Sequence, residues 1–73
     1  MRIRTLDVEM IRVNSRAMSA VGYDPSTQVL KITFSQGNTY DFCRVPQYIF
    51  DGLIGAFSKG TYYNDHIKDR YPC

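Results

Sequence analysis

The segment from Ser58 to Tyr71 holds the densest group of ligand-binding residue types in this 73-residue chain. It combines a glycine, hydroxyl groups, aromatic rings and cations, and its candidate binding residues are Ser58, Lys59, Gly60, Tyr62, Tyr63, Asn64, Lys68 and Arg70. A glycine turn that opens a short helix exposes unpaired backbone N–H groups at the positive end of the helix dipole, where an anionic oxygen is stabilised. The segment therefore predicts a phosphate site, with tyrosines on which a base could stack.

The same residues also have a purely structural interpretation. Gly60 can end a helix, and Tyr63 and Ile67, four positions apart, can close the open end of a core. The three cations of the segment are offset by Asp65 and Asp69, which leaves a net charge of +1. The net charge alone does not distinguish a binding site from a segment that only closes the core.

Catalysis finds little support in the residue pattern. His66 is the chain's one histidine, and its neighbour Asp65 diverges from it on a helical turn, so the two do not form a catalytic pair. Cys43 and Cys73 lie thirty positions apart, without a CxxC motif or a histidine at ligand spacing. We expect a non-enzymatic protein that holds no metal or cofactor.

The two cysteines and the distribution of apolar residues indicate the cellular compartment. Cys43 is expected to be a small buried apolar residue in a strand, and Cys73 a mobile chain end, which suits a reducing cytosol. No leader-like segment appears, and no apolar run approaches the ~20 residues that span a bilayer. The expectation is a cytoplasmic, soluble protein without a membrane partner.

Composition indicates one small globular domain. Hydrophobic residues make up 44% of the chain and charged residues 22%, which argues against disorder. The formal net charge of +2 is low for a protein that binds duplex DNA, although four arginines and two acidic residues give the first sixteen positions a net +2. Arg16 from this stretch joins the candidate site. A core this small favours a shallow groove or a site between subunits, so a homo-oligomer is a further prediction.

Residues 10–43 have the pattern of β-strands. Apolar runs occur at 10–13 and 18–23, and residues 29–34 alternate with Leu30, Ile32 and Phe34 on one face. Turn signals at 24–27 and 36–38 separate the runs. The pattern predicts an α+β fold with a three-stranded antiparallel meander, or a four-stranded one if the first run pairs.

The period changes at Pro46, which suits the first position of a helix. Apolar residues then recur at spacings of three and four, predicting an amphipathic helix that packs Ile49, Phe50, Leu53, Ile54 and Phe57 on the sheet. Gly52 and Gly55 weaken such a helix and suggest close approach to a strand or a partner. A short helical turn follows near residues 62–67.

Several of these residues also carry a resemblance to a known family. Val21-Gly22-Tyr23-Asp24, Leu30-Lys31-Ile32-Thr33-Phe34, Val45-Pro46 and the closing SKGTYYNDHIKDRYP make the chain similar to the KTSC domain from about Val13 to Tyr71. The family is named for its occurrence at the C-terminus of some lysyl-tRNA synthetases, and it also forms stand-alone bacterial or phage proteins. The resemblance implies a three-stranded sheet with a helix and a proposed nucleic-acid-binding role.

The chain departs from the family pattern at two places. Asn14-Ser15 replaces an expected pair of serines, and Tyr63 replaces the more usual Phe. If a serine of that pair contacts a ligand, Asn14 puts the contact in doubt. Residues 1–9 lie outside the pattern and are predicted to be an N-terminal arm, with residues 10–73 as the single KTSC-like domain.

Three functions follow as expectations. The first is a nucleic-acid-binding module, for RNA or single strands, that contacts phosphate through Lys59, Lys68, Arg70 and Arg16. The second is a binder of a small nucleotide or cyclic-nucleotide signal, such as a phage protein that sequesters the signal in counter-defence. The third is an interaction domain that docks on a host complex through exposed tyrosines.

Overall fold

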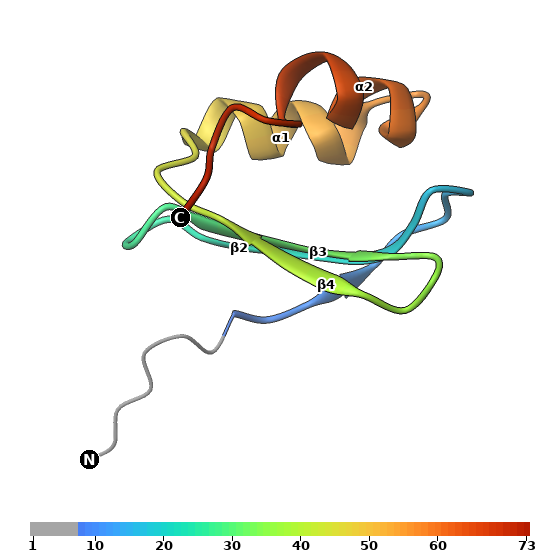
Figure 1. The fold of residues 1–73 in the computed structure, drawn as a ribbon, viewed down its shortest axis with the longest axis horizontal. Coiled ribbons are helices and arrows are strands. Elements are labelled where there is room, and N and C mark those ends of the chain that lie inside the picture. Colours follow the sequence, from blue (N-terminus) through green and yellow to red (C-terminus); the bar gives the residue numbers. More distant parts are fainter. Residues whose placement is uncertain (1–7) are drawn as a thin grey trace.

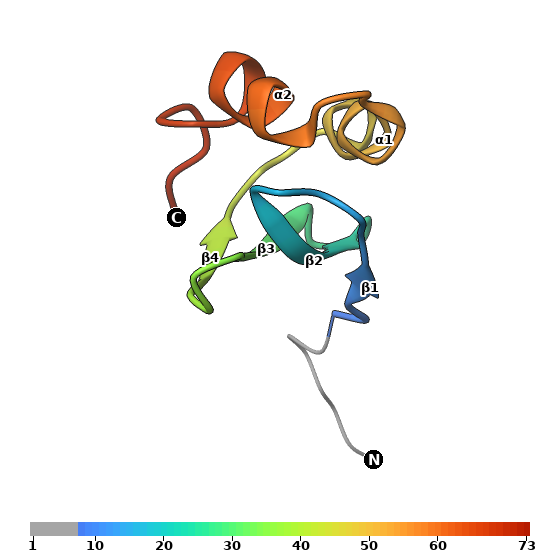
Figure 2. The ribbon, with the colours of Figure 1, turned by 90° about the vertical axis from the view of Figure 1, so that its right-hand side faces the viewer.

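A four-stranded antiparallel sheet is covered on one face by two helices (Figure 1). The protein is described by a computed structural model that places residues 8–73; of the predicted arm, residues 1–7 lie outside the described part. The strands lie in the order β1 (Ile11–Arg12), β2 (Met18–Asp24), β3 (Val29–Phe34) and β4 (Thr39–Phe42), followed by α1 (Gln47–Gly55) and α2 (Lys59–His66). This confirms the α+β fold, and the additional fourth strand is β1, beside β2 (Figure 2).

The core lies between the sheet and the helices. Its side chains come from β2, β3, the segment before α1, α1 itself and the end of α2: Met18, Val21, Leu30, Ile32, Val45, Ile49, Leu53 and Ile67. Leu30 and Ile32 alternate along β3 as predicted. In β2 the register shifts between Met18 and Ala20, and this bulge lets Met18 and Val21, three positions apart, both reach the core.

The two predicted turns connect the strands. Asp24 accepts hydrogen bonds at Oδ1 from the Ser26 hydroxyl, at 2.8 Å, and from the Ser26 N–H, at 2.9 Å. These bonds favour the ionised carboxylate and lower the pKa of Asp24. The second turn contains Gly37, whose φ of 105° is a conformation that side chains other than hydrogen rarely allow.

Helix α1 is shorter than its apolar spacing predicted. Pro46 has extended backbone angles and caps the helix instead of occupying its first turn, and Ala56 ends the helix with φ −69° and ψ 137°. The predicted burial holds for Ile49 and Leu53. It is wrong for Ile54, which is exposed. It is also wrong for Phe57, which is fully exposed because the extended Ala56 takes the chain off the helical path before this residue.

Cys43 and Cys73 form a disulfide, so the prediction of a small buried residue and a mobile chain end is wrong. The chain returns to the end of β4 after α2, where the Cys43 N–H donates to the Tyr71 carbonyl oxygen at 3.0 Å. This return is a long-range pairing that spacing motifs do not encode. Since structural disulfides persist in oxidising compartments, the cysteines no longer support the predicted cytosolic location.

Tyr62 fixes α2 against α1. Its hydroxyl donates to the Ile49 carbonyl oxygen at 3.0 Å. A Cβ added to Gly52 would clash with the Tyr62 hydroxyl and ring. Gly52 therefore serves the close approach that its sequence context suggested, and the approaching group is a tyrosine of the next helix. Gly55 has nothing within 4 Å of the corresponding position.

We predict opposite effects for the two glycine-to-alanine substitutions in α1. Gly55→Ala should raise the free energy of unfolding by about 0.5–1 kcal/mol, because alanine is the better helix former and space is free. Gly52→Ala should lower it by about 1–2 kcal/mol, because displacing Tyr62 costs more than the helix gains. Urea unfolding of both variants measures the difference, and equal stabilisation by both would contradict the Tyr62 contact.

A second prediction concerns the disulfide. Cys73→Ser should lower the free energy of unfolding by about 3–4 kcal/mol, since the bond closes a loop across a sequence separation of 30. Urea unfolding of the wild type with and without a reducing agent, next to the variant, gives the measurement. Reduction should bring the wild type to the stability of the variant; a wild type insensitive to reduction would show that the bond contributes little.

Candidate functional site

A groove of about 570 Å³ lies between the β1–β2 loop and the start of α2. Residues 14–17 line one side of it, and residues 57–61 with Asn64 line the other. Both ribbon views show the β1–β2 loop directly beneath the α1–α2 connection (Figures 1 and 2). Five of the predicted site residues therefore meet in one place: Arg16, Ser58, Lys59, Gly60 and Asn64.

The first turn of α2 supplies hydrogen-bond donors to this groove. Ser58 caps the helix: its Oγ accepts from the Thr61 N–H at 3.3 Å and donates to the Thr61 Oγ1 at 3.0 Å. The first N–H groups of a helix have no intrahelical acceptor. Those of Lys59 and Gly60 therefore remain for an anion, at the positive end of the helix dipole.

Two cations flank these N–H groups. Lys59 Nζ donates to the Ala56 carbonyl oxygen at 3.3 Å, which holds the ammonium group near the end of α1 and leaves two of its three N–H donors for a ligand. Arg16 is exposed, and its backbone carbonyl oxygen accepts from the Ser35 hydroxyl at 2.6 Å. A fixed backbone thus places Arg16 on the opposite side of the groove from Lys59.

Gly60 is where the helix meets the β1–β2 loop. A Cβ at this position would stand 3.0 Å from the Ala17 Cβ, closer than most such contacts. Gly60 lies inside α2, so its role is close packing and not the end of a helix. The loop itself is held by the Ala17 N–H, which donates to Ser15 Oγ at 3.1 Å.

Four predicted site residues lie elsewhere. Tyr62 packs on α1, and Tyr63 packs edge-on against Phe34 and Phe42, with ring centroids 5.1 and 5.9 Å away. Both rings therefore pack against other parts of the fold. For Tyr63 this agrees with the structural alternative, in which the ring closes one end of the core. Lys68 and Arg70 are exposed in the turn after α2 and do not line the groove.

Sequence reasoning missed Phe57 in the groove. It included Thr61 in the predicted segment but not among the candidate residues, and it noted Asn14 and Ser15 only as part of the family pattern. Phe57 was assigned to the apolar face of α1 by its spacing from Leu53 and Ile54. The Ala56-Phe57-Ser58 order, in which a serine cap for the next helix follows at once, was the available signal that α1 ends earlier.

Burial raises the pKa of three tyrosines. For Tyr62 the loss of solvent is the largest cause, followed by the nearby Tyr71 and Tyr48; for Tyr63 it is followed by Asp69 and Tyr40. The pKa of Tyr23 is raised by burial, then by Asp51 and Asp24, and its hydroxyl donates to the Val45 carbonyl oxygen. All three phenols are thus held in the neutral form.

Within residues 8–73, no three His, Cys, Asp or Glu side chains gather as a metal ion would require. None of the helices in this part of the chain has the length and apolar character needed to cross a bilayer.

The arrangement of a small antiparallel sheet covered by two helices has known relatives. The KTSC domain model matches residues 14–71, and the chain belongs to the KTSC domain family. The crystal structure of a KTSC domain protein from Yersinia pestis superposes with a TM-score of 0.86 at 29% identity, over 89% of this chain and 92% of that one.

Sequence relatives show the same domain alone and inside a larger protein. A protein of Tsukamurella paurometabola is 42% identical over 59 residues, 81% of this chain and 88% of that protein. A lysine–tRNA ligase of Nostoc is 31% identical over 62 residues, which are 85% of this chain and 11% of the ligase. The recognition of the family from its C-terminal motif is confirmed.

The raised tyrosine pKa values predict a loss of stability at alkaline pH. An unfolded phenol has a pKa of about 10, so a raised folded-state pKa stabilises the fold fully below pH 10, and this contribution is lost as pH rises through the folded value. Urea unfolding at pH 8 and pH 11 should show the fall. Tyr62→Phe should lose about 1 kcal/mol at pH 8 and show a smaller alkaline fall.

The matched control for this measurement is Tyr48→Phe, since the Tyr48 side chain is 70% exposed. It should match the wild type at pH 8 and keep most of the alkaline fall, because burial, and not Tyr48, is the largest cause of the raised Tyr62 pKa. An alkaline fall that Tyr62→Phe leaves unchanged would contradict the account.

Proposed function

We propose that this KTSC domain binds single-stranded RNA, without catalysing a reaction on it, through the groove between the β1–β2 loop and α2. The proposal rests on the position of Phe57, whose aromatic ring is fully exposed beside Lys59 and the first turn of α2. Covering a fully exposed phenylalanine with a partner is favourable, because its apolar surface leaves water. A nucleotide offers both a base for the ring and a phosphate for the cation.

The phosphate would lie at the start of α2. The Lys59 and Gly60 N–H groups, the Lys59 ammonium and the Arg16 guanidinium can surround one or two phosphate groups from two sides of the groove. The hydroxyls of Ser15 and Thr61 line the same groove and add donors. A site of this kind recognises the backbone and carries little sequence information.

The base would stack on Phe57. Base–aromatic stacking contributes about 1–3 kcal/mol per base and tolerates any base, because every base has a π-face. This role passes to Phe57 from Tyr62 and Tyr63, whose rings pack against α1 and the sheet and do not line this groove. The groove therefore fits one nucleotide step of a flexible strand better than a duplex.

The relatives favour RNA over DNA. The lysine–tRNA ligases that match this chain carry the region within proteins that act on tRNA. The groove volume of about 570 Å³ also suits a single free nucleotide, which is the second candidate. Exchange of the RNA strand for a mononucleotide in the same assay separates the two, since a strand binds more tightly only when neighbouring phosphates contribute.

Filter binding of a short single-stranded RNA across salt concentrations tests the proposal. With about two phosphates neutralised, log affinity should fall with log salt at a slope of about −1.4, and Lys59→Gln should reduce the slope by about 0.7. Phe57→Ala should weaken binding about 5- to 100-fold with the slope unchanged.

Lys68→Gln is the matched control, because it removes the same charge outside the groove. It should leave affinity and slope near those of the wild type. An equal loss in Lys68→Gln and Lys59→Gln, or binding that Phe57→Ala leaves intact, would contradict the groove as the site. Unfolding curves of each variant separate lost binding from lost folding.

A further inference from the structure

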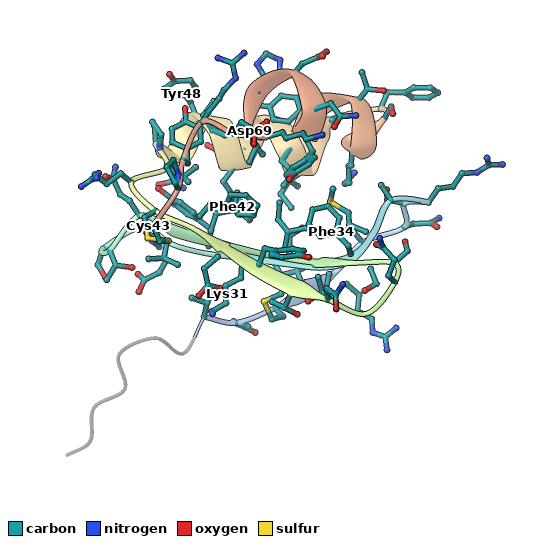
Figure 3. All side chains as sticks on the ribbon, viewed as in Figure 1. Lys31, Phe34, Phe42, Cys43, Tyr48 and Asp69 are labelled. Carbon is teal, nitrogen blue, oxygen red and sulfur yellow. A yellow bond between two sulfur atoms is a disulfide. The ribbon has the colours of Figure 1, made fainter. Side chains whose placement is uncertain are left out.

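A second groove, of about 470 Å³, lies along β4 and the chain that follows α2. Its lining is mostly aromatic and comes from β4, α2 and the C-terminal tail: Tyr40, Phe42, Tyr63, Tyr71 and Pro72. Asp41 and Asp69 complete it. Figure 3 shows Asp69 on the helix side of the groove and Phe42 on the sheet side. It shares no lining residue with the groove proposed for RNA.

The aromatic walls are held in place by the fold. Tyr63 packs edge-on against Phe34 and Phe42, and Tyr40 packs edge-on against Phe34 at 5.6 Å. Tyr40 is nevertheless 52% exposed. A ring that is fixed on one side and open on the other is ready to accept a flat partner with little loss of side-chain freedom.

The third wall depends on the chain end. Tyr71 is held by its carbonyl oxygen, which accepts from the Cys43 N–H at 3.0 Å, and Pro72 precedes the cysteine that is bonded to Cys43. The disulfide therefore fixes both residues beside the exposed edge strand β4.

The charge of the groove is negative. The Asp41 carboxylate is paired with Lys31 at 2.8 Å, whereas Asp69 makes no ion pair within residues 8–73. Lysine and arginine are absent from the described lining. Asp69 and Tyr63 both line the groove. Burial raises the pKa of Tyr63, and the Asp69 charge adds to this effect. An unpaired carboxylate beside open aromatic rings is complementary to an organic cation.

We propose that this groove binds the guanidinium group of an arginine side chain presented by a partner protein. The guanidinium is planar and weakly hydrated, so it can stack on a tyrosine ring while its N–H groups donate to a carboxylate. Tyr40, Tyr63 and Tyr71 supply the rings, and Asp69 supplies the acceptor. The partner would present this arginine on an exposed segment, because the groove is open along the sheet edge.

Titration with two blocked tripeptides tests this site on the full chain by ¹H–¹⁵N NMR. One peptide is Gly-Arg-Gly, and the other carries citrulline, which has the shape of arginine without its charge. The arginine peptide should give saturable shifts at Tyr40, Tyr63, Asp69 and Tyr71, with an affinity at least about fivefold above that of the citrulline peptide. Equal affinity for both peptides, or no shift with either, would overturn the proposal.

Asp69→Asn provides the matched variant. Asp69 has φ 62°, a conformation that asparagine adopts readily, so the variant should keep the fold. The substitution should lower the affinity for the arginine peptide by about fivefold. Asp65→Asn removes the same charge from α2 outside the groove and should leave the affinity unchanged. Unchanged binding in Asp69→Asn, or an equal loss in Asp65→Asn, would overturn the role of Asp69.

Discussion

The contact between Tyr62 and Gly52 sets the position of α2, and both grooves depend on that position. Tyr62 donates to the Ile49 carbonyl oxygen and fills the space that Gly52 leaves. With α2 fixed on α1, Gly60 meets Ala17 on one side and Tyr63 enters the aromatic cluster of the sheet on another. One helix of eight residues thus packs against the core and contributes to the walls of two grooves.

A domain of this size has a low free energy of unfolding, and the structure shows which interactions increase it. Among residues 8–73, eight buried apolar side chains form the core between the helices and one face of the sheet. The Cys43–Cys73 bond ties the chain end to β4, and Tyr23 joins β2 to the segment before α1 through the Val45 carbonyl oxygen. Such cross-links are the usual means by which small domains compensate for limited apolar burial.

The fold could be predicted in large part because its patterns are local. Alternation in β3, the turn at Asp24 and the apolar spacing of Ile49 and Leu53 each predict the structure observed. The disulfide could not be predicted in this way. It depends on the return of the chain past Tyr71, a long-range event that no spacing motif records.

The candidate site was predicted in part for a similar reason. Ser58, Lys59 and Gly60 belong to one helix start, whose chemistry is local, and the structure brings Arg16 to them across the β1–β2 loop. Tyrosine rings suit a core and a ligand equally well, so residue type did not show that Tyr62 and Tyr63 pack against α1 and the sheet, away from the groove at the start of α2. Phe57 shows the opposite case, because its exposure follows from where one helix ends.

The central proposal is that the groove at the start of α2 binds RNA. NMR mapping with a short single-stranded RNA tests it most directly. The account predicts that amide shifts will concentrate at residues 14–17 and 57–61, with the aromatic protons of Phe57 moving most. Shifts confined to Lys68, Arg70 and the residues around them, or spread evenly over the surface, would contradict it.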